Sequence, residues 1–298
     1  RAFLNGKMDL TQAEAVASLI SANGQESAKA SFNLLQGSLS DKISNILDKI
    51  VSLSASMAAW VDYPDEEIPE LDESTLKSTL TSALNELKNL LDNYESGMIM
   101  TQGVNTVIAG RPNAGKSTLM NMLSGKEKSI VTHIEGTTRD IVENSVRLGT
   151  LVLHLSDTAG LRESDDVVEA IGIKKALERI DTSSLVLAVF DSSRELDGDD
   201  KMLIDACKGK KAVAVINKTD LSPAIDTEEI ENNFESSVYI SAKNNTGLKE
   251  LENAVKNILG VEEFDSSAPL IANQRQKLCI QKAYENISEA LSAAELGL

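Results

Sequence analysis

Apolar residues recur at three- and four-residue steps through the first hundred residues of the chain. Residues 10–100 are rich in Ala, Leu, Ser, Lys and Glu, and one apolar stripe comprises Leu35, Leu39, Ile43, Ile46 and Ile50. Such spacing places apolar side chains on one face of an α-helix. The acidic, proline-bounded residues 62–70 cannot continue a helix, and helical spacing resumes at about residues 74–94. This region therefore predicts a long helical hairpin.

From Gly103 the pattern changes to short β-branched runs that alternate with helical segments. The runs cover residues 104–109, 142–148, 151–156, 185–190, 212–216 and 238–240. This alternation is typical of an α/β domain with a mostly parallel sheet. After about Gly260 helical spacing returns, and we expect a buried stripe of Leu278, Ala283, Ile287 and Leu291.

The order of these segments favours an α/β domain inserted into a helical domain. Two separate helical flanks would each have little core, whereas together they can bury one. We predict a first helical part at residues 1–100, an α/β domain at residues 101–262, and a second, truncated helical part at residues 263–298.

Composition and charge narrow the class of protein. The chain has 298 residues, of which 42% are hydrophobic, enough to fill a core in each of roughly two domains. A net charge of -17 repels phosphate backbones, and no basic patch is apparent, so RNA contact would need a partner protein. No apolar run reaches the ~20 residues that cross a bilayer, which predicts a soluble protein without membrane attachment.

The two cysteines and the chain ends give two further expectations. Cys207 and Cys279 fit no metal or redox spacing, so idle thiols in the reducing cytoplasm are expected. The chain starts at Arg1 without an initiator Met or a signal peptide, and it stops soon after a helical pattern. We therefore expect native sequence beyond both ends.

A phosphate-binding motif lies directly after the first predicted strand. Gly110-Arg111-Pro112-Asn113-Ala114-Gly115-Lys116-Ser117 matches G-x-x-x-x-G-K-S between a strand and a helix. Backbone N–H groups of such a loop surround phosphates, and the helix N-terminus adds a favourable dipole. Lys116 would reach the β- and γ-phosphates, and the Ser117 hydroxyl would ligate Mg²⁺.

Two further segments have the spacing of nucleotide-sensing loops. Asp157-Thr158-Ala159-Gly160 ends a strand, so Asp157 would hold a water of Mg²⁺ and the Gly160 N–H would sense the γ-phosphate. An ordinary turn is the weaker interpretation, because the spacing from the phosphate loop suits a second nucleotide motif. Gly136-Thr137-Thr138-Arg139-Asp140 is a candidate first switch loop, in which Thr138 would complete the Mg²⁺ shell.

The base is identified by Asn217-Lys218-Thr219-Asp220, which follows the strand at residues 212–216. The Asp220 carboxylate can accept from N1–H and the 2-amino group of guanine, and adenine offers neither donor. Asn217 can bridge the base to the phosphate loop, and the Lys218 stem can lie over the ring. Ser241-Ala242-Lys243 would supply a backbone N–H toward the guanine oxygen. Guanine is therefore the predicted base.

These motifs in this order resemble those of the translation-factor-related GTPases, and further details resemble one family in that class, the MnmE (TrmE) tRNA-modification GTPases. The likeness runs over nearly the whole chain. It is carried by Arg1-Ala2-Phe3-Leu4-Asn5-Gly6-Lys7, Asp9-Leu10, Gln12-Ala13-Glu14-Ala15, residues 62–67, the phosphate loop, residues 130–140 and residues 157–163. The resemblance implies a Ras-like P-loop G domain inserted into an all-α helical domain.

The resemblance also implies a potassium-activated GTPase that dimerises through its G domains. A monovalent cation between the β- and γ-phosphates can neutralise charge where other GTPases place an arginine. By motif position its ligands would be the Asn113 side chain, the Thr132 and Ile134 carbonyls and Thr137.

The catalytic residue is assigned by the same resemblance. Leu161 follows the glycine of the second switch and cannot polarise water. Glu169 falls where the family places its catalytic glutamate, which acts through a bridging water. A solvated helix charge is the better interpretation of the nearby Asp165 and Asp166.

The expected nucleotide contacts form four groups along the chain. They are Asn113, Ala114, Gly115, Lys116, Ser117 and Thr118; Thr132, His133, Ile134, Glu135, Gly136, Thr137 and Thr138; Asp157, Thr158, Ala159 and Gly160; and Asn217, Lys218, Thr219, Asp220, Ser241, Ala242 and Lys243.

For the whole protein, the family implies a tetrahydrofolate-binding N-terminal domain and the flavoprotein MnmG (GidA) as a partner. Together they would make 5-carboxymethylaminomethyl-type modifications of the wobble uridine of tRNA, which is bound through the complex. The folate domain would precede Arg1, and a cysteine-containing tail would follow Leu298. Lys7 matches a folate-site position but should not bind folate without that domain.

Two other classes of protein are weighed against this assignment. A ribosome-assembly GTPase with similar motifs is the alternative, but such proteins usually add a basic RNA-binding domain, which the acidic helices here do not resemble. A nucleotide-controlled scaffold with negligible turnover is disfavoured by intact Lys116, Thr138, Asp157 and Glu169.

Overall fold

The computed structural model describes residues 1–298 except residues 23, 63–71, 126–143, 156–178, 263 and 297–298. The described chain forms two compact units. The helical unit comprises Arg1–Thr101 and Phe264–Leu298, and the sheet unit comprises Gln102–Glu263. The sheet unit is thus inserted into the helical one.

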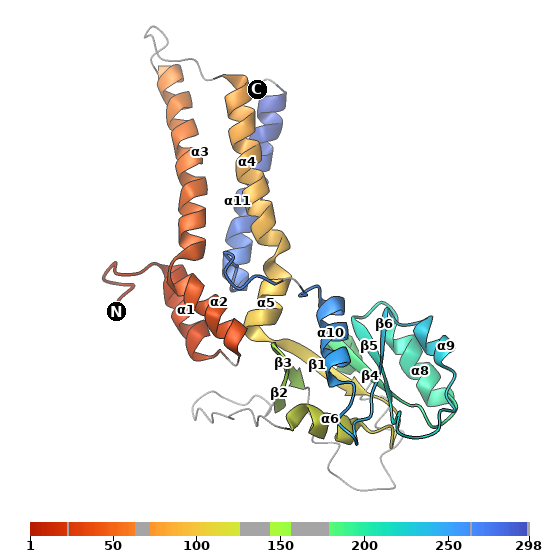
Figure 1. Cartoon of the computed structure of the whole chain (residues 1–298). Helices are drawn as coiled ribbons and strands as arrows, with labels where there is room; N and C mark the ends of the chain where they lie inside the picture. Colours follow the sequence, from red (N-terminus) through yellow and green to blue (C-terminus); the bar gives the residue numbers. More distant parts are fainter. Residues whose placement is uncertain (23, 63–71, 126–143, 156–178, 263, 297–298) are drawn as a thin grey trace. The chain divides into compact units, whose positions relative to one another are not determined.

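Three long helices dominate the helical unit. Its helices are α1 (Leu10–Ile20), α2 (Gln25–Leu35), α3 (Ser38–Asp62), α4 (Glu73–Asp92), α5 (Tyr94–Gln102) and α11 (Gln274–Glu295). Helix α4 packs against α3 on one side and along α11 on the other (Figure 1). The buried core joins residues from both ends of the chain, among them Ala15, Leu34, Leu87, Ile271 and Ile280. Because the two flanks share this core, neither needs to fold separately.

Polar contacts tie the first helix to the last. Asp9 caps α1: its Oδ1 accepts from the Gln12 N–H at 2.7 Å. In turn, Gln12 Oε1 accepts from the Asp9 N–H at 3.0 Å. Glu14 accepts from Arg275 Nε and Nη2, each at 2.8 Å, and from Gln276 Nε2 at 2.7 Å. The hydrogen bond from Arg275 is the main reason that the pKa of Glu14 lies below its usual value. These bonds fix α1 against the start of α11.

The stripe expected on the last helix is wrong at one position. Leu278 is 59% exposed, whereas Ile280 is 6% exposed and belongs to the core. Ile280, Ala283 and Ile287 follow three- and four-residue steps, so they share a face. Leu278 precedes Ile280 by two residues, which is roughly 200° around the helix.

The sheet unit is built on strands in the order β2-β3-β1-β4-β5-β6. The strands are β1 (Val104–Ala109), β2 (Asn144–Leu148), β3 (Leu151–Leu155), β4 (Leu185–Asp191), β5 (Ala212–Asn217) and β6 (Ser236–Tyr239). Only the pair β2 and β3 is antiparallel within this described sheet. The predicted fold class, a mostly parallel α/β domain inserted into a helical one, is confirmed.

Helices cover both faces of this sheet. They are α6 (Lys116–Ser124), α8 (Gly198–Cys207), α9 (Thr227–Glu231) and α10 (Leu248–Leu259). Helices α8 and α10 lie on opposite faces (Figure 1). Under α8, Phe190 of β4 is fully buried and packs edge to face with Phe234 at 5.8 Å between ring centroids.

Parallel pairing brings three loops to one edge of the sheet. Ala109 pairs with Ala188, and Asp191 pairs with Asn217, so β1, β4 and β5 end side by side. In an open α/β sheet, ligands bind beyond the carboxyl ends of the strands. The phosphate loop follows β1 at this edge, so we expect a ligand site there.

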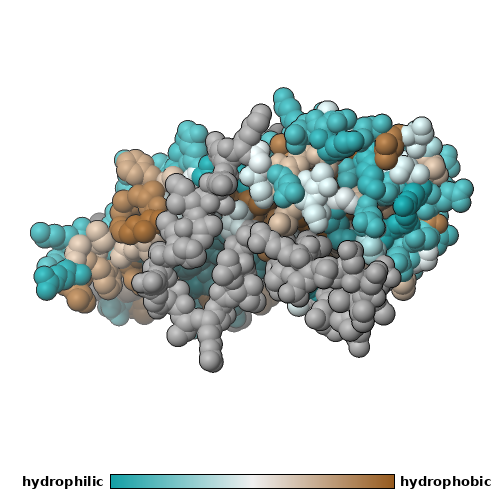
Figure 2. Space-filling view, turned by 90° about the horizontal axis from the view of Figure 1, so that it is seen from below, coloured by the Kyte–Doolittle hydropathy of each residue, from teal (hydrophilic) through white to brown (hydrophobic). Residues whose placement is uncertain are grey.

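The surface of the sheet unit is largely hydrophilic on the face at the right of Figure 2. Acidic residues such as Asp205, Glu228, Glu231 and Glu235 are exposed on or near α8 and α9. None of the helices that the structure describes is long and apolar enough to cross a membrane.

Candidate functional site

The loop between β1 and α6 requires glycine at two positions. A Cβ at Gly110 would lie 2.5 Å from the Val189 carbonyl oxygen, which is backbone and cannot move aside. Gly115 has φ +99°, and a Cβ there would overlap the side-chain nitrogen of Asn217. Asn113, at φ +61°, adopts a left-handed conformation that asparagine tolerates. The two glycines therefore let the loop backbone lie close to the end of β4 and to the Asn217 side chain.

Lys116 lies within this loop and braces it. Its Nζ donates to the carbonyl oxygens of Gly110 and Arg111, both at 2.7 Å. Burial lowers the pKa of Lys116 to about 8. Ser117 and Thr118 are exposed in the first turn of α6, where N–H groups and the helix dipole favour an anion. The geometry suits a phosphate-binding loop.

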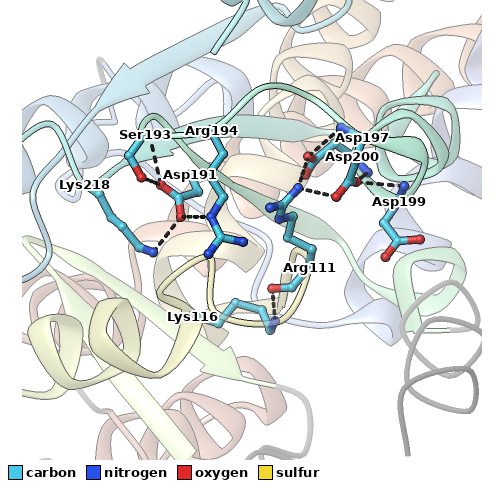
Figure 3. A network of polar contacts seen from close by, with 9 residues as sticks. All are labelled: Arg111, Lys116, Asp191, Ser193, Arg194, Asp197, Asp199, Asp200 and Lys218. Carbon is cyan, nitrogen blue, oxygen red and sulfur yellow. Dashed lines mark hydrogen bonds and ion pairs between the residues drawn. The ribbon is translucent and has the colours of Figure 1, made fainter. Parts of the chain in front are cut away.

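Arg111 fastens the far side of the same loop to helix α8. Its Nη1 contacts the carboxylates of Asp197 and Asp200, the latter at 3.1 Å (Figure 3). Asp197 also caps α8 by accepting from the N–H groups of Asp199 and Asp200. Burial raises the pKa of Asp200. Arg111 occupies a variable position of the motif, so the motif alone could not predict this contact.

Asn217 connects the phosphate loop to the loop after β6. Its Nδ2 donates to the Ala114 carbonyl at 3.0 Å, and its Oδ1 accepts from the Ala242 N–H at 3.0 Å. The side chain is only 2% exposed, so both bonds are shielded from water. Asn217 therefore links the phosphate loop to the loop after β6, and the Ala242 N–H is engaged by Asn217.

Asp220 lies exposed beside these loops. Ser241 Oγ donates to its Oδ1 at 2.6 Å, and the Thr219 N–H donates to the Ile240 carbonyl at 3.2 Å. The bond from Ser241, with lesser help from the charges of Lys243 and Lys218, holds the pKa of Asp220 below its usual value. Asp220 is thus an exposed, charged acceptor with one oxygen held by Ser241.

Lys218 extends toward the end of β4 and meets an acid that the motif does not contain. Its Nζ donates to Asp191 Oδ2 at 2.6 Å (Figure 3). Asp191 ends a strand that is buried along its whole length. An acid at the end of an apolar run in the sequence could have indicated this contact, because a buried carboxylate needs a partner.

The structure brings together the phosphate loop and the two base loops. These loops are residues 113–118, 217–220 and 241–243. Several predicted positions lie outside the described residues. They are Thr132, His133, Ile134, Glu135, Gly136, Thr137, Thr138, Asp157, Thr158, Ala159, Gly160 and Glu169. Lys7 is exposed and belongs to the helical unit, apart from these loops in the chain.

Two oxygen donors at the phosphate loop suit a hard cation. Over the described part of the chain, no three His, Cys, Asp or Glu side chains gather as a metal site. The exposed Ser117 hydroxyl in the first turn of α6 and the exposed Asn113 side chain are the donors present. Mg²⁺ often takes few protein ligands and completes its shell with phosphate and water oxygens. The Ser117 hydroxyl fits that mode of binding.

Comparison with known proteins shows close relatives over the length of the chain. A family model described as the MnmE helical domain matches residues 10–298. A tRNA modification GTPase MnmE from Natranaerobius thermophilus is 40% identical over 298 residues, which are 99% of this chain and 64% of that protein. One from Clostridioides difficile is 39% identical over 300 residues, covering 99% of this chain and 65% of that protein. The chain thus spans under two thirds of these relatives.

Among solved structures, the G domain of the FeoB iron transporter from T. maritima is 25% identical to this chain. The alignment covers 52% of this chain and 98% of the FeoB domain, with a TM-score of 0.37.

Proposed function

This chain belongs to the MnmE family, and on that premise we propose that it binds GTP and hydrolyses it to GDP and phosphate as the GTPase part of a tRNA-modification protein. The proposal is carried by one observation. Asn217 joins the phosphate loop to the loop after β6 through two shielded hydrogen bonds. This connection holds a phosphate-binding loop beside a base-binding loop, as a ligand with phosphates at one end and a base at the other requires.

The base end supports guanine. Asp220 is charged and exposed, and Ser241 holds one of its oxygens in place. A carboxylate fixed in this way accepts from N1–H and the 2-amino group of guanine, whereas adenine would leave it unpaired. The Lys218 side chain extends from this loop to Asp191 of β4, and its stem can contact the ring.

The phosphate end supports hydrolysis at the γ-phosphorus. A water oxygen bonds to that phosphorus while the bond to the β–γ bridging oxygen breaks, giving GDP, phosphate and a released proton. Lys116 and the α6 N-terminus stabilise the negative charge. We assign Glu169 to orient the attacking water through a second water, with Gly160 and Thr138 sensing the γ-phosphate; these roles rest on motif position.

Two cations belong to this proposal. Ser117, Thr138 and Asp157 would hold Mg²⁺ and its waters, and the ion would neutralise charge on the phosphates. Asn113, Thr132, Ile134 and Thr137 would hold K⁺, which would supply the positive charge that an arginine supplies in other GTPases. For Ser117 and Asn113, exposure at the loop supports the assignment.

At the level of the whole protein we propose the family's task. The chain would act as a G-domain homodimer with the flavoprotein MnmG in the cytoplasm. That complex would bind tRNA and modify its wobble uridine, using a tetrahydrofolate derivative bound by a separate N-terminal domain with Lys7 nearby. The exposed acidic residues on and near α8 and α9 support tRNA contact through a partner rather than through this surface.

The test is GTP turnover by the purified chain in KCl and in NaCl at equal ionic strength. We expect faster hydrolysis in KCl, and equal rates would refute the proposed potassium site. Glu169→Ala should retain GTP binding and hydrolyse GTP much more slowly, while the matched Asp166→Ala should keep the wild-type rate. Loss of GTP affinity in Glu169→Ala would show a structural role instead.

Base choice has its own test. Asp220→Asn should shift preference from guanine toward xanthine nucleotides, because the amide donates where the carboxylate accepts. An unchanged preference for guanine would overturn the assignment of residues 217–220 to base recognition.

A further inference from the structure

The contact between Lys218 and Asp191 links the base loop to a strand that has no part in the predicted motifs. Lys218 has φ +66°, a left-handed conformation that a lysine rarely adopts and that costs free energy unless the surroundings hold it. Its Nζ donates to Asp191 Oδ2 at 2.6 Å. Both ends of the lysine are therefore fixed, the backbone by the loop and the ammonium by the carboxylate.

Asp191 is itself held rigidly. Its Oδ1 accepts from the Ser193 N–H at 3.0 Å and from Ser193 Oγ at 2.6 Å, and its side chain is 3% exposed. The Nε of the exposed Arg194 lies 4.0 Å from Oδ2 (Figure 3). Burial by itself would raise the pKa of Asp191, but the hydrogen bonds from Lys218 and Ser193 lower it, so the carboxylate stays charged.

The register of the sheet sets the distance that Lys218 must span. Asp191 of β4 pairs with Asn217 of β5, and Lys218 is the residue directly after Asn217. Asp191 therefore lies beside the residue that precedes the lysine. The lysine side chain therefore reaches from the end of β5 to the carboxylate at the end of β4. A flexible stem would lose rotamer freedom when a base packs on it, whereas an anchored stem has lost that freedom beforehand.

We propose that Asp191 is a positioning residue for guanine recognition, which fixes the Lys218 stem as a preformed apolar surface for the base. This inference rests on the proposed function, because it presumes that a guanine nucleotide binds at residues 217–220. Asp191 acts through Lys218 and does not touch the base. Its effect is therefore confined to binding of the base and absent from binding of phosphate.

The test measures the dissociation constants of GDP and of inorganic pyrophosphate for the whole chain. Asp191→Asn keeps the shape of the side chain but removes the charge that holds Lys218. We expect it to weaken GDP binding about tenfold and to leave pyrophosphate binding unchanged. Asp205→Asn, an exposed acid on α8 that pairs with Lys208, is the matched control and should bind GDP as wild type does.

A double-mutant cycle shows whether Asp191 works through the lysine. Lys218→Met keeps an apolar stem without the ammonium, so it should weaken GDP binding as much as Asp191→Asn does. The double variant should then bind GDP within about twofold of either single variant, because the coupling is counted once. Lys218→Met also supplies the answer if Asp191→Asn does not fold, since wild-type GDP affinity in Lys218→Met refutes the proposal.

The outcomes separate this inference from the proposed function. Losses that add in the double variant, or an equal loss of pyrophosphate affinity, would show that Asp191 supports the fold generally. Wild-type GDP affinity in Asp191→Asn would also overturn the inference while leaving the GTPase proposal intact. A wild-type chain that binds pyrophosphate but not GDP would defeat the proposed function as well.

Discussion

Replacement of Asn217 perturbs the connection between the phosphate loop and the base loops most directly. Asn217→Ala removes both partners at once, leaving the Ala114 carbonyl and the Ala242 N–H without them. Ala114 is fully buried and Ala242 is 5% exposed, so water replaces neither bond easily. Each unsatisfied buried group costs about 1–3 kcal/mol, so the two together cost about 2–6 kcal/mol. That is a large share of the stability of an ordinary domain, about 5–15 kcal/mol.

Asn217→Asp separates the two bonds, because it keeps the size of the side chain. The Ala242 N–H still has an acceptor, but the Ala114 carbonyl now faces an oxygen at about the same place. A carboxyl only 2% exposed has its pKa raised above the unfolded value of about 3.9. Below pH 4 it is protonated and can donate to Ala114. Its stability contribution is therefore lost as pH rises toward the folded pKa.

Urea unfolding at pH 4.5, 6 and 8 measures the effect. Trp60 is the sole tryptophan and belongs to α3, so its fluorescence follows the helical unit, whereas far-UV circular dichroism follows both units. We expect Asn217→Asp to lower the dichroism midpoint increasingly from pH 4.5 to pH 8, with a smaller effect on the Trp60 transition. Asn257→Asp, an exposed control on α10, should lack this dependence.

Two results would refute the reasoning. If Asn217→Asp is as stable as wild type at pH 8, the Ala114 bond does not contribute. If the loss is the same at every pH, the introduced carboxyl is not buried as the wild-type amide is.

Three further predictions concern titration and packing. Burial lowers the pKa of Lys116 to about 8, so GDP affinity should fall from pH 7 to pH 9 more steeply in wild type than in Lys116→Gln. Since the folded pKa lies below the unfolded one, Lys116 should also add stability to the nucleotide-free chain as pH rises above 8. Burial raises the pKa of Cys207 to about 12 while Cys279 is exposed, so maleimide at pH 7 should label Cys279 alone until urea unfolds the chain. Ile280→Ala should destabilise the helical unit by about 2–5 kcal/mol, read from Trp60 fluorescence, with GDP affinity unchanged.

Strand positions were largely predictable because each buried strand leaves a β-branched run in the sequence. The run at residues 104–109 matches β1 at both ends. The observed β4 and β5 each continue one residue past the predicted run, to Asp191 and Asn217. Those two polar residues pair with each other across the strands, and apolar periodicity cannot register a polar residue that extends a ladder.

Helix faces were less predictable than helix positions. The spacing of apolar residues located α3, α4 and α11 well, but Leu278 is exposed although it is as hydrophobic as its buried neighbours. Which apolar residues become core depends on where α4 and α1 pack on α11, and these helices lie far from α11 in the sequence.

The sequence by itself determined the element types, the parallel α/β class and the positions of the phosphate and base motifs. These follow from local spacing and from residue chemistry at strand ends. Only the tertiary structure decided which side chains meet: Asn217 with Ala114, Arg111 with Asp200, and Lys218 with Asp191. The physical reason is that parallel strands distant in sequence end at one edge of the sheet, so the partners are set by strand order and register.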